Sequence, residues 1–118
     1  MISVRHIKGF LQIVVLDDDA QACPQIVQFR MFNPSELGYF LKDAIARVTF
    51  VRDNYHDSEE ASRAYHQGEV MVVNRANTYP LIATLSFDCS TVRLTILDKT
   101  LSLVLQDADE LVGQLFEV

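Results

Sequence analysis

Three short apolar runs in the last third of the sequence place the strongest constraint on the fold. They read PLIATLSFD, TVRLTILD and TLSLVLQD, and only the short turns DCS and DK separate them. Apolar residues alternate with hydroxyl or charged residues within each run, as Leu81, Ala83 and Leu85 do in the first. This alternation is typical of strands with one buried face, and the turns are too short for a crossover helix. The runs therefore predict a three-stranded antiparallel meander.

A helix is predicted upstream, in NPSELGYFLKDAIARV. Asn33 can cap its start, Pro34 suits the first helical position, and Glu36 lies near the positive end of the helix dipole. The apolar residues of this segment repeat every three or four positions: Leu37, Phe40, Leu41, Ala44, Ile45 and Val48. We expect this stripe to pack on the sheet over Ser35 to Val48.

Two further helices are predicted, one strong and one weak. After the meander, Asp107 and Glu110 have the spacing of a capping box, which would turn Leu111, Leu115 and Phe116 inward. The weaker helix runs from about Ser58 to Gln67 and stops at Gly68. Its few apolar residues, Ala61, Ala64 and Tyr65, predict a largely exposed helix that covers the core.

Strands account for the rest of the predicted structure. We expect them at Ser3 to Phe10, Leu11 to Leu16 with Gly9 at the bend, Gln25 to Phe32, Val48 to Arg52 and Glu69 to Asn74. The fold class is therefore α+β: a mostly antiparallel sheet with a C-terminal three-stranded meander, packed by two or three helices. The length predicts a single domain spanning 1–118.

Charge and composition narrow the possible partners. The formal net charge is −6, which argues against direct binding of nucleic acid or anionic membrane and leaves a basic protein partner open. The apolar stretch from Phe10 to Leu16 is too short to cross a bilayer, and 1–10 lacks the apolar block of a signal peptide. We expect a cytoplasmic protein. Cys23 and Cys89 form no CxxC pattern, so reduced thiols are favoured over a zinc or redox site.

Catalytic signatures do not favour an enzyme. The sequence contains no GxSxG, HExxH, P-loop or GxGxxG pattern. His56 lies among carboxylates, His66 stands near the end of the weak helix, and His6 lies in a strand. Each position is explained by a solvated or structural role. We therefore expect neither catalysis nor a cofactor.

Three consecutive carboxylates, Asp17, Asp18 and Asp19, follow an apolar strand in VVLDDDAQ. They could bind Mg²⁺ or Ca²⁺, but the segment lacks the glycine and the distal glutamate of a calcium loop. We interpret the triplet as a solvated turn that ends the strand and, as a second reading, as part of a partner-binding surface.

A segment rich in carboxylates and tyrosines, FVRDNYHDSEEASRAYHQGE, is the strongest candidate for binding a partner. Carboxylates steer a basic protein into contact, and tyrosine is a frequent interface hot spot. The predicted binding residues are Asp53, Tyr55, Asp57, Glu59, Glu60 and Tyr65, joined by Asp17, Asp18 and Asp19 if the fold brings them together. The alternative is a polar helix and loop whose charge serves solubility.

These features predict a small acidic binding protein that neutralises a basic partner, in the way that an immunity protein or antitoxin inhibits a nuclease toxin. One alternative is a small-molecule sensor or unrecognised enzyme with a pocket between the meander and the first helix, lined by Tyr39, Phe40 and Phe87. Another is a self-assembling structural protein, in which a second copy completes the edge of the strand at Leu11 to Leu16.

Overall fold

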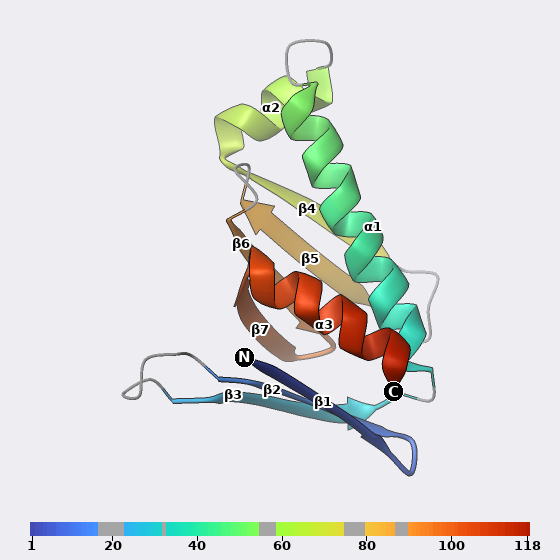
Figure 1. Cartoon of the computed structure of the whole chain (residues 1–118). Helices are drawn as coiled ribbons and strands as arrows, with labels where there is room; N and C mark the ends of the chain where they lie inside the picture. The colour runs from blue at the N-terminus through green and yellow to red at the C-terminus, as the bar shows by residue number, and fades with distance from the viewer. Residues whose placement is uncertain (17–22, 32, 55–58, 75–79, 87–89) are drawn as a thin grey trace.

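The computed structural model describes residues 1–16, 23–31, 33–54, 59–74, 80–86 and 90–118, with only the backbone of Glu60. This part of the chain forms two antiparallel sheets and three helices, which confirms the α+β class and corrects the expectation of one sheet (Figure 1). The elements are β1 Ile2–Ile7, β2 Phe10–Val15, β3 Gln25–Arg30, α1 Pro34–Asp53, α2 Glu59–Gln67, β4 Glu69–Asn74, β5 Leu81–Ser86, β6 Thr91–Ile96, β7 Lys99–Val104 and α3 Leu105–Glu117.

The predicted meander is present as β5, β6 and β7, with Leu85 opposite Val92 and Leu94 opposite Leu101. Strand β4 pairs with β5, so the order in this sheet, which we call sheet B, is β4-β5-β6-β7. Along β5 and β6 every second residue is buried, as the alternation predicts.

The other sheet, sheet A, has the order β1-β2-β3. A two-residue turn joins β1 to β2, in which both Lys8 and Gly9 have positive φ, at 54° and 81°. Such a turn matches the twist of a hairpin, and Gly9 lies at the predicted bend. Strand β2 pairs on both sides, with β1 and with β3. The expectation that Leu11 to Leu16 is an open edge is therefore wrong.

At two strand edges, the side-chain amide of a glutamine takes the hydrogen-bonding place that the backbone of a neighbouring strand would otherwise occupy. In β3, the Gln25 amide donates to the Ser102 carbonyl and accepts from the Ser102 N–H of β7, both at 2.9 Å. In α3, the Gln114 amide donates to the Ile2 carbonyl at 2.8 Å and accepts from the Val4 N–H of β1 at 3.1 Å. Each amide satisfies two backbone groups that a further strand would otherwise pair. The first of these contacts links sheet A to sheet B.

Helices α1 and α3 lie side by side over the inner faces of the two sheets (Figure 1). The predicted apolar stripe of α1 is buried, with Leu37, Leu41, Ala44 and Val48 all at 0% exposure. Helix α3 contributes Leu111 and Leu115, which are also fully buried. One hydrophobic core therefore joins both sheets through the helix layer.

The strand predicted at Val48 to Arg52 is instead the last part of α1. Val48 and Val51 continue the spacing of three or four residues set by Ala44, and both are buried. The Thr49 hydroxyl donates to the Ile45 carbonyl one turn back, at 2.9 Å. Burial of this stripe outweighs the strand propensity of the β-branched residues.

The start of α3 also differs from the prediction. The helix begins at Leu105 with Val104 at the N-cap position, which makes no side-chain cap bond, so Asp107 does not open a capping box. The helix follows β7 without an intervening loop, and the Leu105 N–H donates to the Ser90 carbonyl at 3.2 Å. Leu111 and Leu115 are buried as expected, but Phe116 is 40% exposed.

Candidate functional site

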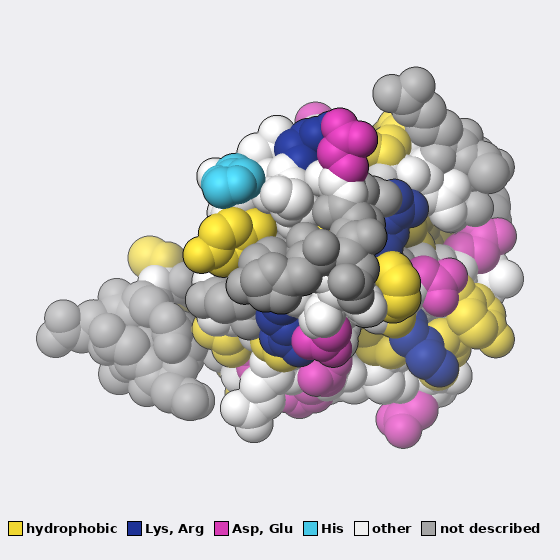
Figure 2. All heavy atoms as spheres, turned by 90° about the horizontal axis from the view of Figure 1, so that it is seen from above, with side chains coloured by type: hydrophobic (Ala, Val, Ile, Leu, Met, Phe, Trp, Pro, Cys, Tyr) yellow, Lys and Arg dark blue, Asp and Glu magenta, His cyan; other side chains and the backbone are white. Residues whose placement is uncertain are grey.

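Two described carboxylates of the predicted binding segment lie beside arginines. Asp53 Oδ1 is 3.4 Å from Arg52 Nε, and Glu59 Oε1 is 3.6 Å from Arg63 Nη2. Figure 2, which views this end of the molecule from above, shows basic and acidic side chains interspersed among the described residues. Exposed pairs of this kind add little stability, but they reduce the net negative charge that a basic partner would meet.

Tyr65 lies on α2 and is 51% exposed, while Ala61 and Ala64 are buried as predicted. Its ring meets that of His66 edge to face, with centroids 5.6 Å apart. The remaining predicted binding residues, Asp17, Asp18, Asp19, Tyr55 and Asp57, lie outside the described residues, as does the side chain of Glu60. The prediction that the acidic segments at 17–19 and 53–60 form one surface therefore concerns residues that lie largely outside the described part of the chain.

A denser group of carboxylates lies on α3, which the sequence interpretation did not identify as a binding element. The helix carries Asp107, Asp109, Glu110 and Glu117 and contains no lysine or arginine. Asp107 Oδ1 is 3.8 Å from the amino nitrogen of Met1, and Glu110 accepts from Gln114 Nε2 at 3.2 Å. The signal was visible in the sequence as a short helical segment with acidic residues and no cation.

An exposed aromatic pair joins α1 to α3. Tyr39 and Phe116 meet edge to face with centroids 4.9 Å apart, and they are 61% and 40% exposed. Gly38 permits this contact, because a Cβ there would lie 3.2 Å from Phe116 Cζ. Glu36 and Asp43 stand one helical turn to either side of Tyr39. The pair is thus bordered by carboxylates on α1 and on the neighbouring α3.

Two hollows flank this aromatic pair. One, of about 390 Å³, lies between α1 and β4 and is lined by Glu36, Tyr39, Phe40, Asp43, Arg47, Val72, Val73 and Asn74. The other, of about 310 Å³, lies between α1 and α3 and is lined by Lys42, Ile45, Asp109, Val112 and Phe116. We call the surface formed by Glu36, Tyr39, Asp43, Asp109, Phe116 and Glu117 the helix face. Tyr39 and Phe40, predicted to line a pocket between the meander and the first helix, line instead the hollow beside β4, and Phe87 lies outside the described residues.

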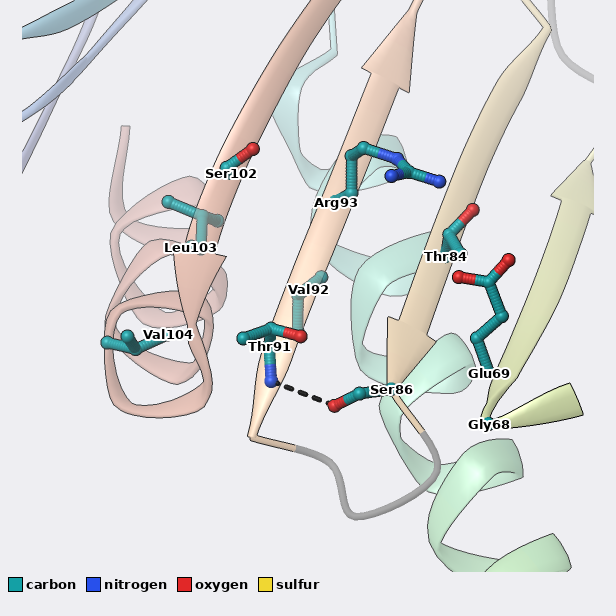
Figure 3. Close-up of a pocket in the computed structure, with 10 residues that line it drawn as sticks. All are labelled: Gly68, Glu69, Thr84, Ser86, Thr91, Val92, Arg93, Ser102, Leu103 and Val104. Atoms are coloured by element: carbon teal, nitrogen blue, oxygen red, sulfur yellow. Dashed lines mark hydrogen bonds between the residues drawn. The ribbon is translucent and has the colours of Figure 1, made fainter. Parts of the chain in front are cut away.

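The outer face of sheet B carries a further hollow, of about 410 Å³ (Figure 3). The Arg93 side chain extends across β5 toward Thr84 and Glu69, and the Thr91 N–H donates to Ser86 Oγ at 3.1 Å. The residues that line it include five with hydroxyl groups or a carboxylate, but no histidine or cysteine. This open, hydroxyl-rich face offers hydrogen bonds but lacks a pair of groups suited to acid–base or nucleophilic chemistry.

The histidines and cysteines show no catalytic arrangement in the described part of the chain. His6 Nε2 donates to the Met31 carbonyl at 2.7 Å, so this nitrogen serves to join β1 to the residue after β3. Cys23 is exposed, and His56 and Cys89 lie outside the described residues. Among the described residues no three His, Cys, Asp or Glu side chains are grouped to hold a metal ion. None of the described helices is both long and apolar enough to span a membrane.

Comparison with known proteins adds no assignment. No family model matches the chain, and no curated protein or solved structure is detectably similar to it.

Proposed function

We propose that this chain is a small acidic binding protein that holds a basic protein against its helix face, in the manner of an immunity protein or antitoxin that inhibits a nuclease toxin. The observation that carries the proposal is the exposed Tyr39–Phe116 pair, bordered by carboxylates on α1 and α3. Aromatic side chains at the centre of an interface supply much of the binding energy, and surrounding carboxylates speed association with a basic surface.

The exposed side of α1 extends this surface toward the residues identified from the sequence. Phe50 is 66% exposed and lies three turns from Tyr39 on the same side of α1, close to Asp53 at the helix end. Tyr65 and Glu59 on α2 follow in the chain. A basic partner that contacts the helix face and the rest of α1 would meet the exposed rings of Tyr39, Phe116 and Phe50 in addition to the carboxylates. Inhibition would follow by occlusion, because carboxylates can occupy a site built for phosphates.

The test is capture of partners from native lysate on the immobilised chain, at low and at high salt, with proteins quantified by mass spectrometry. We expect one basic protein in near-equal amount, reduced by salt, and lost from the double variant Tyr39→Ala with Phe116→Ala. Met71→Ala is the control, since Met71 is 65% exposed on β4 and lines neither of the hollows beside the aromatic pair. If the double variant captures the same proteins as the parent, the helix face is not the binding surface.

A second candidate function, small-molecule sensing, is favoured by the hollow between α1 and β4. It combines the aromatic side chains of Tyr39 and Phe40 with the carboxylates of Glu36 and Asp43, and its volume of about 390 Å³ suits a metabolite. A ligand that binds the folded state raises the melting temperature in proportion to the logarithm of its concentration. A metabolite library should therefore contain a compound that stabilises the parent but not Asp43→Ala, and its absence would count against this candidate.

A further inference from the structure

We infer that the outer face of sheet A binds an acidic protein segment that also presents apolar side chains. This inference is independent of the proposed function, because it concerns the opposite side of the sheet from the helix layer. Figure 1 shows this side turned away from α1 and α3. The face is formed by Ser3, Arg5, Ile7, Phe10, Gln12, Val14, Ile26, Gln28 and Arg30.

The register of the three strands brings these residues into rows. Arg5 lies opposite Gln12, which lies opposite Gln28, and Ile7 lies opposite Phe10, which lies opposite Arg30. The third row is Ser3, Val14 and Ile26. Side chains in such rows stand close enough to act as one surface.

Large apolar side chains are exposed on this face. Ile7 is 59% exposed, Ile26 is 58% exposed and Phe10 is 40% exposed. Ile7 and Phe10 lie together in one row, and Ile26 lies beyond the polar row of Arg5, Gln12 and Gln28. The solvent side of an antiparallel sheet is ordinarily polar, and exposed apolar area on it marks interaction sites.

The charge of the face is opposite to that of the chain as a whole. Arg5 and Arg30 lie on the face and Lys8 lies in the adjoining turn, whereas the described stretches 1–16 and 23–31 contain no carboxylate. The net charge of the whole chain is −6. The Arg30 guanidinium stands over the Phe10 ring, 5.4 Å from its centroid. Two such faces would repel each other, so charge complementarity calls for an acidic occupant.

A hollow shows how an occupant would be held. It measures about 290 Å³ and is lined by Arg5, Ile7, Lys8, Phe10, Gln12 and Gln28. Apolar walls from Ile7 and Phe10 can take an aliphatic or aromatic side chain. The cations can pair with carboxylates on either side of it, and the two glutamine amides can bond to backbone groups. An acidic segment with interspersed apolar residues meets all of these groups.

Single-stranded nucleic acid fits this face less well. Such ligands rely on open aromatic rings as stacking platforms, but Phe10 is the one aromatic residue among the outer-face residues, and Arg30 covers one side of its ring. We therefore assign the face to an acidic protein segment.

The inference is tested by titrating the isotope-labelled chain with a short synthetic peptide in which Asp and Leu alternate, and following backbone amide signals by NMR. We expect saturable shifts in β1, β2 and β3, with affinity weakened at least about tenfold by Arg5→Glu and also reduced by Ile26→Ala. Arg93→Glu is the matched control, because it makes the same charge change on the outer face of sheet B. It should leave the affinity within about twofold of the parent.

Four outcomes of the titrations would overturn the inference: no shifts in sheet A, equal weakening by Arg93→Glu, equal binding of a peptide with Lys in place of Asp, or tighter binding of oligothymidylate. The last would assign the face to nucleic acid. In a separate experiment, the amide signals of the chain without peptide are recorded at a series of protein concentrations. If the same amides shift with protein concentration alone, the occupant is a second copy, and the assignment to a separate acidic segment fails. None of these outcomes depends on the helix face.

Discussion

Both sheets are antiparallel, but their outer faces differ in the charge and in the side chains of their central strands. In sheet B, the outward residues of the central strands β5 and β6 include Thr84, Ser86, Thr91 and Thr95, and Arg93 is the charged residue among them. In sheet A, Ile7, Phe10 and Ile26 are exposed among cations. Hydroxyl groups remain hydrated at little cost, whereas exposed apolar area costs roughly 25 cal/mol per Å² relative to burial. Sheet B also exposes Met71, Val73 and Val104 on its two edge strands, so what distinguishes sheet A is that its exposed apolar residues lie among cations in stretches without a carboxylate.

The inner faces of the two sheets are both buried, so truncation of a core residue should cost a similar free energy of unfolding in either sheet. These truncations have the largest expected effect on stability. Ile13 in β2 and Leu94 in β6 are both fully buried in central strands. Truncation of either to alanine should lower the free energy of unfolding by about 2–5 kcal/mol. Urea denaturation followed by circular dichroism measures this. A loss below about 1 kcal/mol for Ile13→Ala alone would mean that sheet A contributes little to the common core.

Substitution of the two glutamines that bind strand edges should have the next largest effect on stability. Gln114→Leu removes two hydrogen bonds to partly buried groups of β1, and we expect a loss of about 1–3 kcal/mol. Gln25→Leu removes two hydrogen bonds to β7 that are more exposed to solvent, so its loss of unfolding free energy should be smaller. The same denaturation experiment ranks the two. The reverse ranking would show that the junction between the sheets, rather than the docking of α3, is the stronger restraint.

Replacement of one arginine on each outer face should have a smaller effect on stability. The loss of unfolding free energy should be larger in sheet A than in sheet B. Arg30 stacks on Phe10, so Arg30→Gln should lower the free energy of unfolding by about 0.5–1 kcal/mol. Among the described residues Arg93 forms no ion pair, and Arg93→Gln should change stability by less than about 0.5 kcal/mol. Thermal unfolding at low salt gives both values. Equal losses would contradict a stabilising contact at Arg30.

Exchange of apolar and hydroxyl residues between the outer faces should leave stability almost unchanged but alter dye binding. Ile26→Thr should reduce the fluorescence of a hydrophobic dye bound to the folded chain, and Thr95→Ile should increase it. Unfolding free energies should shift by less than about 0.5 kcal/mol in either variant. Unchanged dye binding in Ile26→Thr would show that the apolar residues of sheet A do not act as a patch.

Period-two alternation made much of the fold predictable. It identified β5, β6 and β7, and Gly9 indicated the β1–β2 turn. The division into two sheets could not be predicted, because β3 meets β7 through the Gln25 side chain, and a single glutamine gives no pattern in the sequence. The strand expected at Val48 to Arg52 followed local propensity, which long-range burial on α1 overrides.

The candidate site was predicted only in its chemistry. The sequence indicated carboxylates beside exposed aromatic residues, and Asp53, Glu59 and Tyr65 remain candidates. The helix face shows the same combination, but it joins α1 to α3 across most of the chain length. The contact between Tyr39 and Phe116 depends on helix packing and on the bare backbone of Gly38, and neither is encoded in a local segment. The outer face of sheet A was missed because its cations are separated in the sequence, with Arg5 in β1, Lys8 in the following turn and Arg30 in β3.

Gln114 has a consequence for how the chain avoids aggregation. Its bonds to Ile2 and Val4 span 112 and 110 positions, so the last helix protects the edge of the first strand. An uncovered edge is a template for intermolecular strand pairing. Any event that loosens α3, such as proteolytic trimming or a destabilising substitution in its buried stripe, would therefore expose the edge of β1 while it weakens the common core. Loosening of the last helix should thus promote fibril-like association together with unfolding.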